Sequence, residues 1–211
     1  TRRQLGHWRY TRSLFSHMLT IAPKSDLVHL GLGIALAREG SPGEAETHLR
    51  AAVQLEPLRS DSHVALGNLL AAQNRHNEAI AAYWEAIRIE PTRAATHLNL
   101  GAALAAQGRT EEAIAAYREA LRLRPDYAAA HRNLAGLYSR TGKVNDATEH
   151  ADAAVRMSPG DVSTLFDAAV IYSKAGRARD AEQVYREVLR MVSAHLPARN
   201  NLAVLLAMQD R

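Results

Sequence analysis

Apolar positions along the chain recur at spacings of three and four, which is the pattern of amphipathic helices. In the middle of the chain one apolar stripe contains Leu100 and Leu104, and the next contains Tyr117 and Leu121. Gly108 lies between the two stripes, and a proline follows the second. The pattern therefore predicts two helices joined by a tight turn, with the proline ending the second helix.

The same pattern returns every 34 residues. Prolines mark its period at Pro23, Pro57, Pro91, Pro125 and Pro159. Alanines form a second ladder in this phase at Ala45, Ala79, Ala113, Ala147 and Ala181. Histidines form a third ladder at His29, His63, His97 and His131, and small residues follow them at Gly33, Gly67, Gly101 and Ala135. Several ladders in one phase predict an all-α solenoid built from helix–turn–helix hairpins.

These ladders divide the chain into five full repeats and two partial ones. The full repeats are 26–59, 60–93, 94–127, 128–161 and 162–195. Residues 1–25 are expected to hold only a second helix, over 11–22, with Phe15 and Met18 at its packing positions. Residues 196–211 are expected to hold only a first helix, over 197–209.

Glycines and a capping signal supply the local turn chemistry. Gly40, Gly108, Gly142 and Gly176 fall between the two helices of a repeat, where a left-handed residue is needed. The run Ser41-Pro42-Gly43-Glu44 predicts a capping box with proline at the first helical position. The small residues at the Gly33 position are expected to let the second helix approach closely, with the alanine ladder facing them.

Composition supports helices and excludes several classes of protein. The chain has 40 alanines, 26 leucines and only 5% aromatic residues, a balance that favours helix over strand. It has no cysteine, which rules out a disulfide scaffold and any thiolate metal site. The formal net charge of +4 is too small to indicate nucleic-acid binding. No apolar run approaches the roughly 18 residues of a membrane span.

The repeat resembles the tetratricopeptide repeat (TPR) family. The second repeat supplies the family pattern at His63, Leu66-Gly67, Leu70, Ala79, Tyr83, Ala86 and Pro91. The fifth repeat departs from it, with Ala168-Ala169 in place of Leu-Gly and Ser193 in place of proline. The resemblance implies a right-handed α-solenoid whose concave wall is built from first helices. It also implies a non-catalytic module that binds an extended polypeptide in that groove.

One groove position carries an amide ladder in the later repeats. Two residues after each histidine position stand Gly31, Ala65, Asn99, Asn133, Asp167 and Asn201. An asparagine can pair with a peptide N–H and a peptide C=O together, so a row of them can hold an extended chain whatever its side chains. This row resembles the asparagine ladders of O-linked N-acetylglucosamine transferases and importin-type solenoids. The alternative is that these are ordinary polar residues on a helix surface.

Four further residues complete the predicted groove: Asn68, Arg132, Arg140 and Lys174. The cations could capture acidic groups of a ligand, or could simply solvate the helix face. TPR domains that clamp acidic chaperone tails need cations where this chain has Leu30 or Val64, Ala129 and Asn133. A chaperone-tail clamp is therefore not expected.

No catalytic, cofactor or metal signature is present. The sequence contains no nucleophile elbow, P-loop or HExxH motif. The ladder histidines occur once per repeat, so neighbours lie a helical layer of about 8–10 Å apart. Zinc requires ligand nitrogens at about 2.0–2.1 Å, so these histidines are interpreted as packing residues. The chain is expected to be neither an enzyme nor a metalloprotein.

The two ends leave other functions open. Residues Gln4 to Tyr10, with Ser13-Leu14-Phe15, resemble the segment that joins membrane glycosyltransferase-like proteins to their TPR tails. That resemblance implies a substrate-recognition tail of a larger enzyme outside the cytoplasm, whereas a cytoplasmic scaffold is equally open. The apolar residues Leu202, Leu205, Leu206 and Met208 offer a third possibility, head-to-tail self-association through the open C-terminal end.

Overall fold

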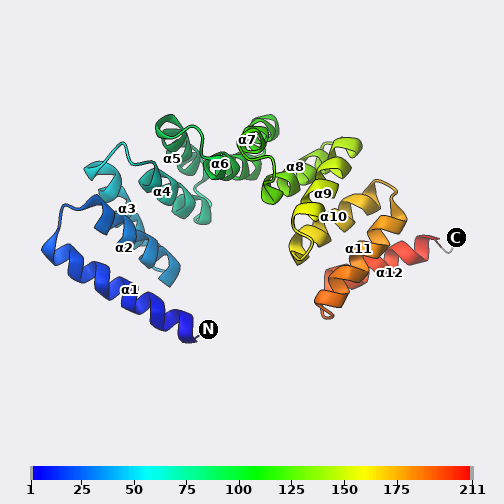
Figure 1. Cartoon of the computed structure of the whole chain (residues 1–211), viewed down its shortest axis with the longest axis horizontal. Coiled ribbons are helices and arrows are strands. Elements are labelled where there is room, and N and C mark those ends of the chain that lie inside the picture. The colour runs from blue at the N-terminus through cyan, green and yellow to red at the C-terminus, as the bar shows by residue number, and fades with distance from the viewer. Residues whose placement is uncertain (1, 210–211) are drawn as a thin grey trace. The chain divides into compact units, whose positions relative to one another are not determined.

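The computed structural model describes residues 2–209, and their side chains from residue 12 onward. Most of the side chains that carry the N-terminal glycosyltransferase-like resemblance therefore lie outside the described residues. Across the described part of the chain the structure consists of helices, turns and loops without strands (Figure 1). The helices are α1 (Arg2–Ile21), α2 (Asp26–Glu39), α3 (Pro42–Leu55), α4 (Ser60–Ala72), α5 (His76–Ile89), α6 (Ala94–Ala106), α7 (Thr110–Leu123), α8 (Ala128–Arg140), α9 (Val144–Met157), α10 (Val162–Lys174), α11 (Ala178–Met191) and α12 (Leu196–Gln209). The all-α prediction is confirmed.

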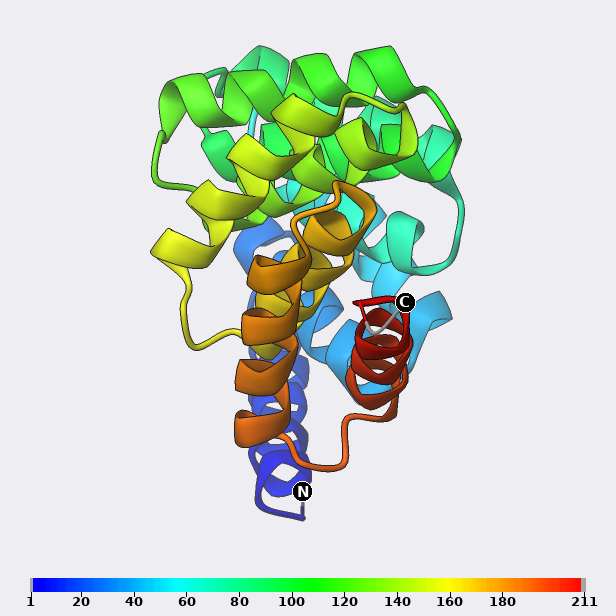
Figure 2. The ribbon, with the colours of Figure 1, turned by 90° about the vertical axis from the view of Figure 1, so that its right-hand side faces the viewer.

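The helices group into two compact halves, Thr1–Arg109 and Thr110–Arg211. In the first half α2 packs on α3 and α4 on α5, and in the second half α8 packs on α9 and α10 on α11. Helix α12 lies beside α11, as Figures 1 and 2 both show. Consecutive helix–turn–helix hairpins are the building plan of an α-solenoid. Among the described residues no helix is both long and apolar enough to cross a membrane.

The turns between paired helices use left-handed residues, as predicted. The φ angles of Gly40, Gly108, Gly142 and Gly176 are 86°, 75°, 75° and 74°. Asn74 occupies the same position in the second repeat with a φ of 61°. Asparagine enters this region more easily than most residues with a side chain, so the turn survives without glycine.

Helix starts only partly follow the predicted capping chemistry. Pro42 begins α3 as expected, but the Ser41 side chain makes no capping hydrogen bond, so the predicted capping box is wrong. The backbone of Ser41 (φ −107°, ψ 67°) lies outside the usual extended N-cap conformation. Side-chain caps occur instead at Ser25 and Asp161, which accept hydrogen bonds from backbone N–H groups three residues later.

Helix α1 is longer than the sequence predicted. It begins at Arg2 rather than near residue 11. The added residues are mostly good helix formers, and one interior glycine, Gly6, costs only about 1 kcal/mol. The ring of Phe15 fills the space that a side chain on Gly31 would need, with ring atoms 2.4 Å from an ideal Cβ position. Phe15 therefore packs α1 on α2, as predicted, whereas the predicted packing role of Met18 is wrong because that side chain is 38% exposed.

The close helix contacts involve larger partners than predicted. The five ladder alanines are buried, so their packing role is correct. At Gly67, however, the three atoms nearest an added Cβ all belong to Tyr83, the first at 2.6 Å. At Gly33 the nearest atoms belong to Leu49, at 2.7 and 2.8 Å. The glycines thus make room mainly for a bulky residue of the second helix, four positions after the ladder alanine.

Removing an unsatisfied hydroxyl should stabilise the first half. The hydroxyl of Ser62 is fully buried, and no hydrogen-bond partner is recorded for it. Val28 and Ala130 occupy the equivalent position in other repeats. Because an unpaired buried polar group costs about 1–3 kcal/mol, we expect Ser62→Ala to raise the free energy of unfolding by about 1 kcal/mol. Urea denaturation would measure this, and a lower stability would show that the hydroxyl has a partner.

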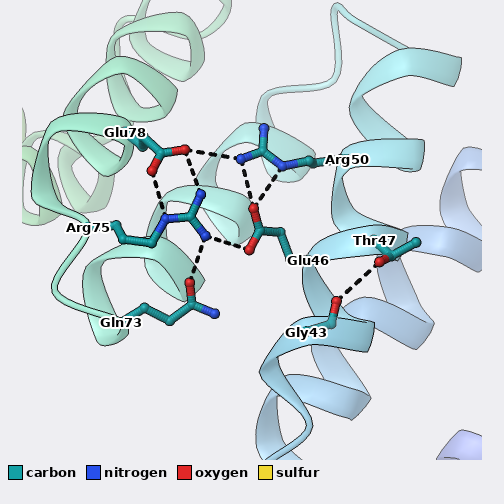
Figure 3. Close-up of polar contacts among 7 residues, drawn as sticks. All are labelled: Gly43, Glu46, Thr47, Arg50, Gln73, Arg75 and Glu78. Atoms are coloured by element: carbon teal, nitrogen blue, oxygen red, sulfur yellow. Dashed lines mark hydrogen bonds and ion pairs between the residues drawn. The ribbon is translucent and has the colours of Figure 1, made fainter.

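A charged network joins the second helices of neighbouring repeats in the first half (Figure 3). The Arg75 guanidinium donates to Glu46 at 2.6 Å and to Glu78 at 2.7 and 2.6 Å, and Arg50 also pairs with both carboxylates. Hydrogen bonding to Arg75 lowers the pKa of Glu46 and of Glu78. The network therefore ties α3 to the start of α5 on a surface that carries none of the predicted groove residues.

Candidate functional site

The predicted groove residues all lie on first helices of the hairpins. Asn68 is on α4 and Asn99 on α6 in the first half, and the others are on α8, α10 and α12 in the second half. The structure brings Asn68 and Asn99 together, and it places Arg132 near Asp167.

In the first half, two groove asparagines and one tyrosine form a hydrogen-bonded chain. The hydroxyl of Tyr83 donates to Oδ1 of Asn68 at 2.8 Å. The Nδ2 group of Asn99 donates to the same oxygen at 2.9 Å. These bonds fix both amide planes and leave the Asn68 N–H groups and the Asn99 carbonyl oxygen for another partner.

Tyrosines anchor the asparagines of the second half in the same way. Asn133 hydrogen-bonds the hydroxyl of Tyr117. The Nδ2 group of Asn201 donates to the hydroxyl of Tyr185 at 3.2 Å. Burial raises the pKa of Tyr117 to about 12, so its hydroxyl is neutral near pH 7 and stays a hydrogen-bonding partner. We call these contacts the Tyr–Asn pairs.

The sequence analysis missed these tyrosines, although a signal was present. Tyr185 precedes Asn201 by 16 residues, and Tyr117 precedes Asn133 by the same interval. A separation of 16 residues places a tyrosine of one second helix behind the first helix of the next repeat. That placement follows from how the repeats pack on each other and cannot be read from the spacing alone. The predicted Asn residues are thus oriented by their scaffold.

Replacing Tyr117 by phenylalanine removes its hydroxyl and keeps the buried ring. We expect Tyr117→Phe to lower the free energy of unfolding by about 1 kcal/mol, the typical value of a single hydrogen bond. The Asn133 amide should also lose its fixed orientation, which would appear as faster averaging of its side-chain NH₂ signals in NMR spectra. Unchanged Asn133 signals would contradict the anchoring role.

The predicted groove cations differ in their partners. The Arg132 guanidinium lies 3.6 Å from Asp161 and 3.8 Å from Asp167. Burial raises the pKa of Asp167, and Arg132 opposes that shift. Arg132 is therefore shared between two carboxylates of the protein.

Arg140 and Lys174 are exposed, and no ion pair is recorded for either within residues 12–209. The charge of Arg140 acts on the Tyr117 hydroxyl, which locates it near the Tyr117–Asn133 pair. Lys174 lies in the last turn of α10. Arg140 is thus the cation best placed beside an anchored asparagine.

Two surface cavities are lined by predicted groove residues of the first half. In the first half a cavity of about 550 Å³ lies along α2 and α4, with Ile34, Val64 and Asn68 in its lining. A smaller cavity of about 280 Å³ is lined by Asn68, Tyr83 and Asn99 among others. The hydrogen-bonded chain of the first half therefore borders open concave space, large enough in the first case for a ligand side chain.

The ladder histidines serve structural contacts. Nε2 of His63 and of His97 lies 2.9 Å from the carbonyl oxygen of the proline six residues earlier. Both rings are buried, which agrees with a packing role. Within the described residues no group of three or more histidine, aspartate or glutamate side chains could hold a metal ion.

Sequence and structure comparisons identify the family. Models described as "TPR repeat" match residues 67–108 and 103–142, and models described as "Tetratricopeptide repeat" match residues 27–51 and 166–211. Together they cover more than half of the chain. The matches begin at residue 27, so the glycosyltransferase-like resemblance of the N-terminal segment gains no support from them. No curated protein sequence matches the chain.

Solved structures share the fold at low sequence identity. PilF of Pseudomonas aeruginosa superposes with a TM-score of 0.83 at 19% identity, over 95% of this chain and 91% of PilF. YrrB, described as a TPR protein with an unusual peptide-binding site, gives 0.68 at 16% identity over 89% of this chain and 96% of YrrB. A chain of the APC/C hetero-tetramer Cut9–Hcn1 superposes with a TM-score of 0.81 at 15% identity. The match covers 97% of this chain but only 40% of the other. The chain belongs to the tetratricopeptide repeat family, whose fold serves as a protein-interaction module.

Proposed function

We propose that the chain binds extended polypeptide through groove asparagines on its first helices, Asn99 in the first half and Asn133 and Asn201 in the second. The observation that carries the proposal is the Tyr–Asn pair. A tyrosine behind the surface holds the amides of Asn133 and Asn201, and Asn68 holds that of Asn99. The remaining amide groups can still bond a peptide. Rigid, preoriented donors and acceptors lose less entropy on binding than mobile ones.

Other residues support this function. Asn68 continues the hydrogen-bonded chain in the first half, and Arg140 lies close enough to Tyr117 to oppose the rise of its pKa on burial. Arg132, Asp167 and Lys174 complete the proposed surface in the second half. The peptide-binding site named for YrrB offers a precedent among proteins of the same fold.

A selection from random peptides displayed on phage tests the proposal. Peptides selected on the wild-type protein should bind through their backbone, because amide ladders contact backbone N–H and C=O groups. N-methylation of the central peptide bonds should therefore weaken binding more than alanine substitutions at the same positions. Selected peptides that depend only on their side chains would contradict the amide-ladder mechanism.

Self-association is a second candidate function, favoured by one observation. Helix α12 exposes Leu196, Val204 and Met208, each more than 60% accessible. Leu205, included in the predicted open face, is buried and does not belong to it. Light scattering over a range of concentrations would detect assembly through this face, and a monomer at high concentration would rule it out.

A further inference from the structure

Two histidine pairs occupy equivalent places in the two halves. Nδ1 of His29 lies 3.0 Å from Nδ1 of His48, between α2 and α3. Nδ1 of His131 lies 2.8 Å from Nδ1 of His150, between α8 and α9. The ring centroids are 5.1 and 5.0 Å apart, with planes tilted by 39° and 42°. The same arrangement therefore arises twice, in separate repeats.

A backbone carbonyl determines which nitrogen of each pair carries the proton. Nε2 of His29 lies 3.1 Å from the carbonyl oxygen of Pro23, and His131 has the same contact with Pro125 at 3.1 Å. A carbonyl oxygen only accepts hydrogen bonds, so Nε2 of His29 must carry its hydrogen. The Nδ1 atom of neutral His29 is then an acceptor, and Nδ1 of His48 must be the donor.

This arrangement limits the number of protons that a pair can hold. The first added proton can go to Nε2 of His48, which leaves the bond from its Nδ1 to His29 intact. A second proton would have to go to Nδ1 of His29, and two N–H groups would then face each other at about 3 Å. A closed pair thus holds one proton fewer than two separate imidazoles.

Burial makes protonation harder still. Burial is the main cause that lowers the pKa of His48, with His29 adding to it and Glu44 opposing it. Burial also lowers the pKa of His150, with a further contribution from His131. Around that second pair Glu149 and Asp146 of α9 oppose the shift, and Arg118 of α7 reinforces it. On α8, the ring of Tyr138 stacks on the ring of His150, with the ring centroids 5.6 Å apart.

We propose that each histidine pair is a proton-operated latch, which closes its hairpin when neutral and opens it as protons bind, because burial resists the first proton and the facing N–H groups exclude the second. This inference goes beyond peptide binding and does not depend on it. The ordinary pKa of histidine in an unfolded chain is about 6.5. The pKa values of His48 and His150 in the folded chain are lower than this. The closed hairpin is therefore fully stable above pH 6.5 and loses stability as the pH falls through the pKa values of the folded chain. Each excluded proton changes the opening constant by up to tenfold per pH unit.

Other hairpins of the chain provide matched controls. Ala82 stands in the second repeat where the first has His48, and Ala116 stands there in the third. His48→Ala and His150→Ala therefore introduce the residue that neighbouring repeats already use. The hairpin α4–α5 keeps the contact of its ladder histidine, His63, with Pro57 but has no second histidine, so it should lack the latch.

Hydrogen–deuterium exchange of the full chain at pH 7 and pH 5, corrected for the intrinsic pH dependence of exchange, tests the latch. Local opening of α2–α3 and α8–α9 should increase tenfold or more on acidification, while α4–α5 changes little. In the variant with both His48→Ala and His150→Ala, all these hairpins should respond alike. NMR titration should find His48 and His150 protonating below pH 6.5. An equal response of α4–α5 in the wild type, or pKa values of 6.5 or above for His48 and His150, would overturn the proposal.

Discussion

Gly67→Leu is expected to lower the free energy of unfolding by roughly 1–3 kcal/mol, at the upper end of that range. An added Cβ would lie 2.6 Å from the Tyr83 ring, and a leucine extends further in the same direction. The ring has little room to move, because only 2% of Tyr83 is accessible and Asn68 holds its hydroxyl. The higher helix propensity of leucine returns only about 1 kcal/mol. Urea denaturation would measure the loss.

Gly67→Ala is the matched control for this prediction. Ala169 occupies the equivalent position in the fifth repeat, where Tyr185 stands in place of Tyr83, so a methyl group is compatible with a tyrosine in such a hairpin. We expect a small net change, since the gain in helix propensity offsets the shift of the tyrosine ring. A leucine variant as stable as the alanine variant would show that α4 and α5 are not in close contact here.

Tyr138→Ala should have a still larger effect, about 3–5 kcal/mol, the usual cost of truncating a buried aromatic residue. Tyr138 is 1% accessible, packs within α8 and α9, and stacks on His150. Its removal leaves a cavity that the rigid hairpin cannot close. Thermal or urea unfolding of the variant would measure the loss.

Tyr138→Leu separates the cavity from the loss of the aromatic ring. Leu36, Leu70 and Leu104 occupy the equivalent position in the first three repeats, and each is fully buried. We therefore expect the leucine variant to lose much less stability than the alanine variant. Equal losses for the two variants would contradict an explanation based on packing volume.

Repetition explains why so much of the fold could be predicted. A residue that recurs every 34 positions has the same environment each time, so helix pairing, left-handed glycines and buried alanines follow from one repeat. The exact repeat boundaries stay a prediction. The observed helices fit them, but they would also fit boundaries moved by a few residues. The early start of α1 was missed because the helix continues through Gly6, which is in phase with the turn glycine Gly40.

Contacts between helices explain most of what could not be predicted. The histidine pairs join positions 19 residues apart, and the sequence analysis compared ladder histidines only with one another. The Tyr–Asn pairs likewise join one repeat to the next. Arg132 was predicted as a ligand contact from its position alone, whereas its carboxylate partners depend on how α8 and α10 pack.

The central claim is that anchored asparagines bind a peptide backbone, and the affinity of one phage-selected peptide tests it most directly. Isothermal titration calorimetry would compare the wild type with Asn133→Ala, using Asn145→Ala on the exposed face of α9 as the control. Loss of two hydrogen bonds of about 0.5–1.5 kcal/mol each should weaken binding by about five- to 150-fold in the Asn133 variant. The Asn145 variant should bind like the wild type. Equal affinities for all three proteins would contradict the account.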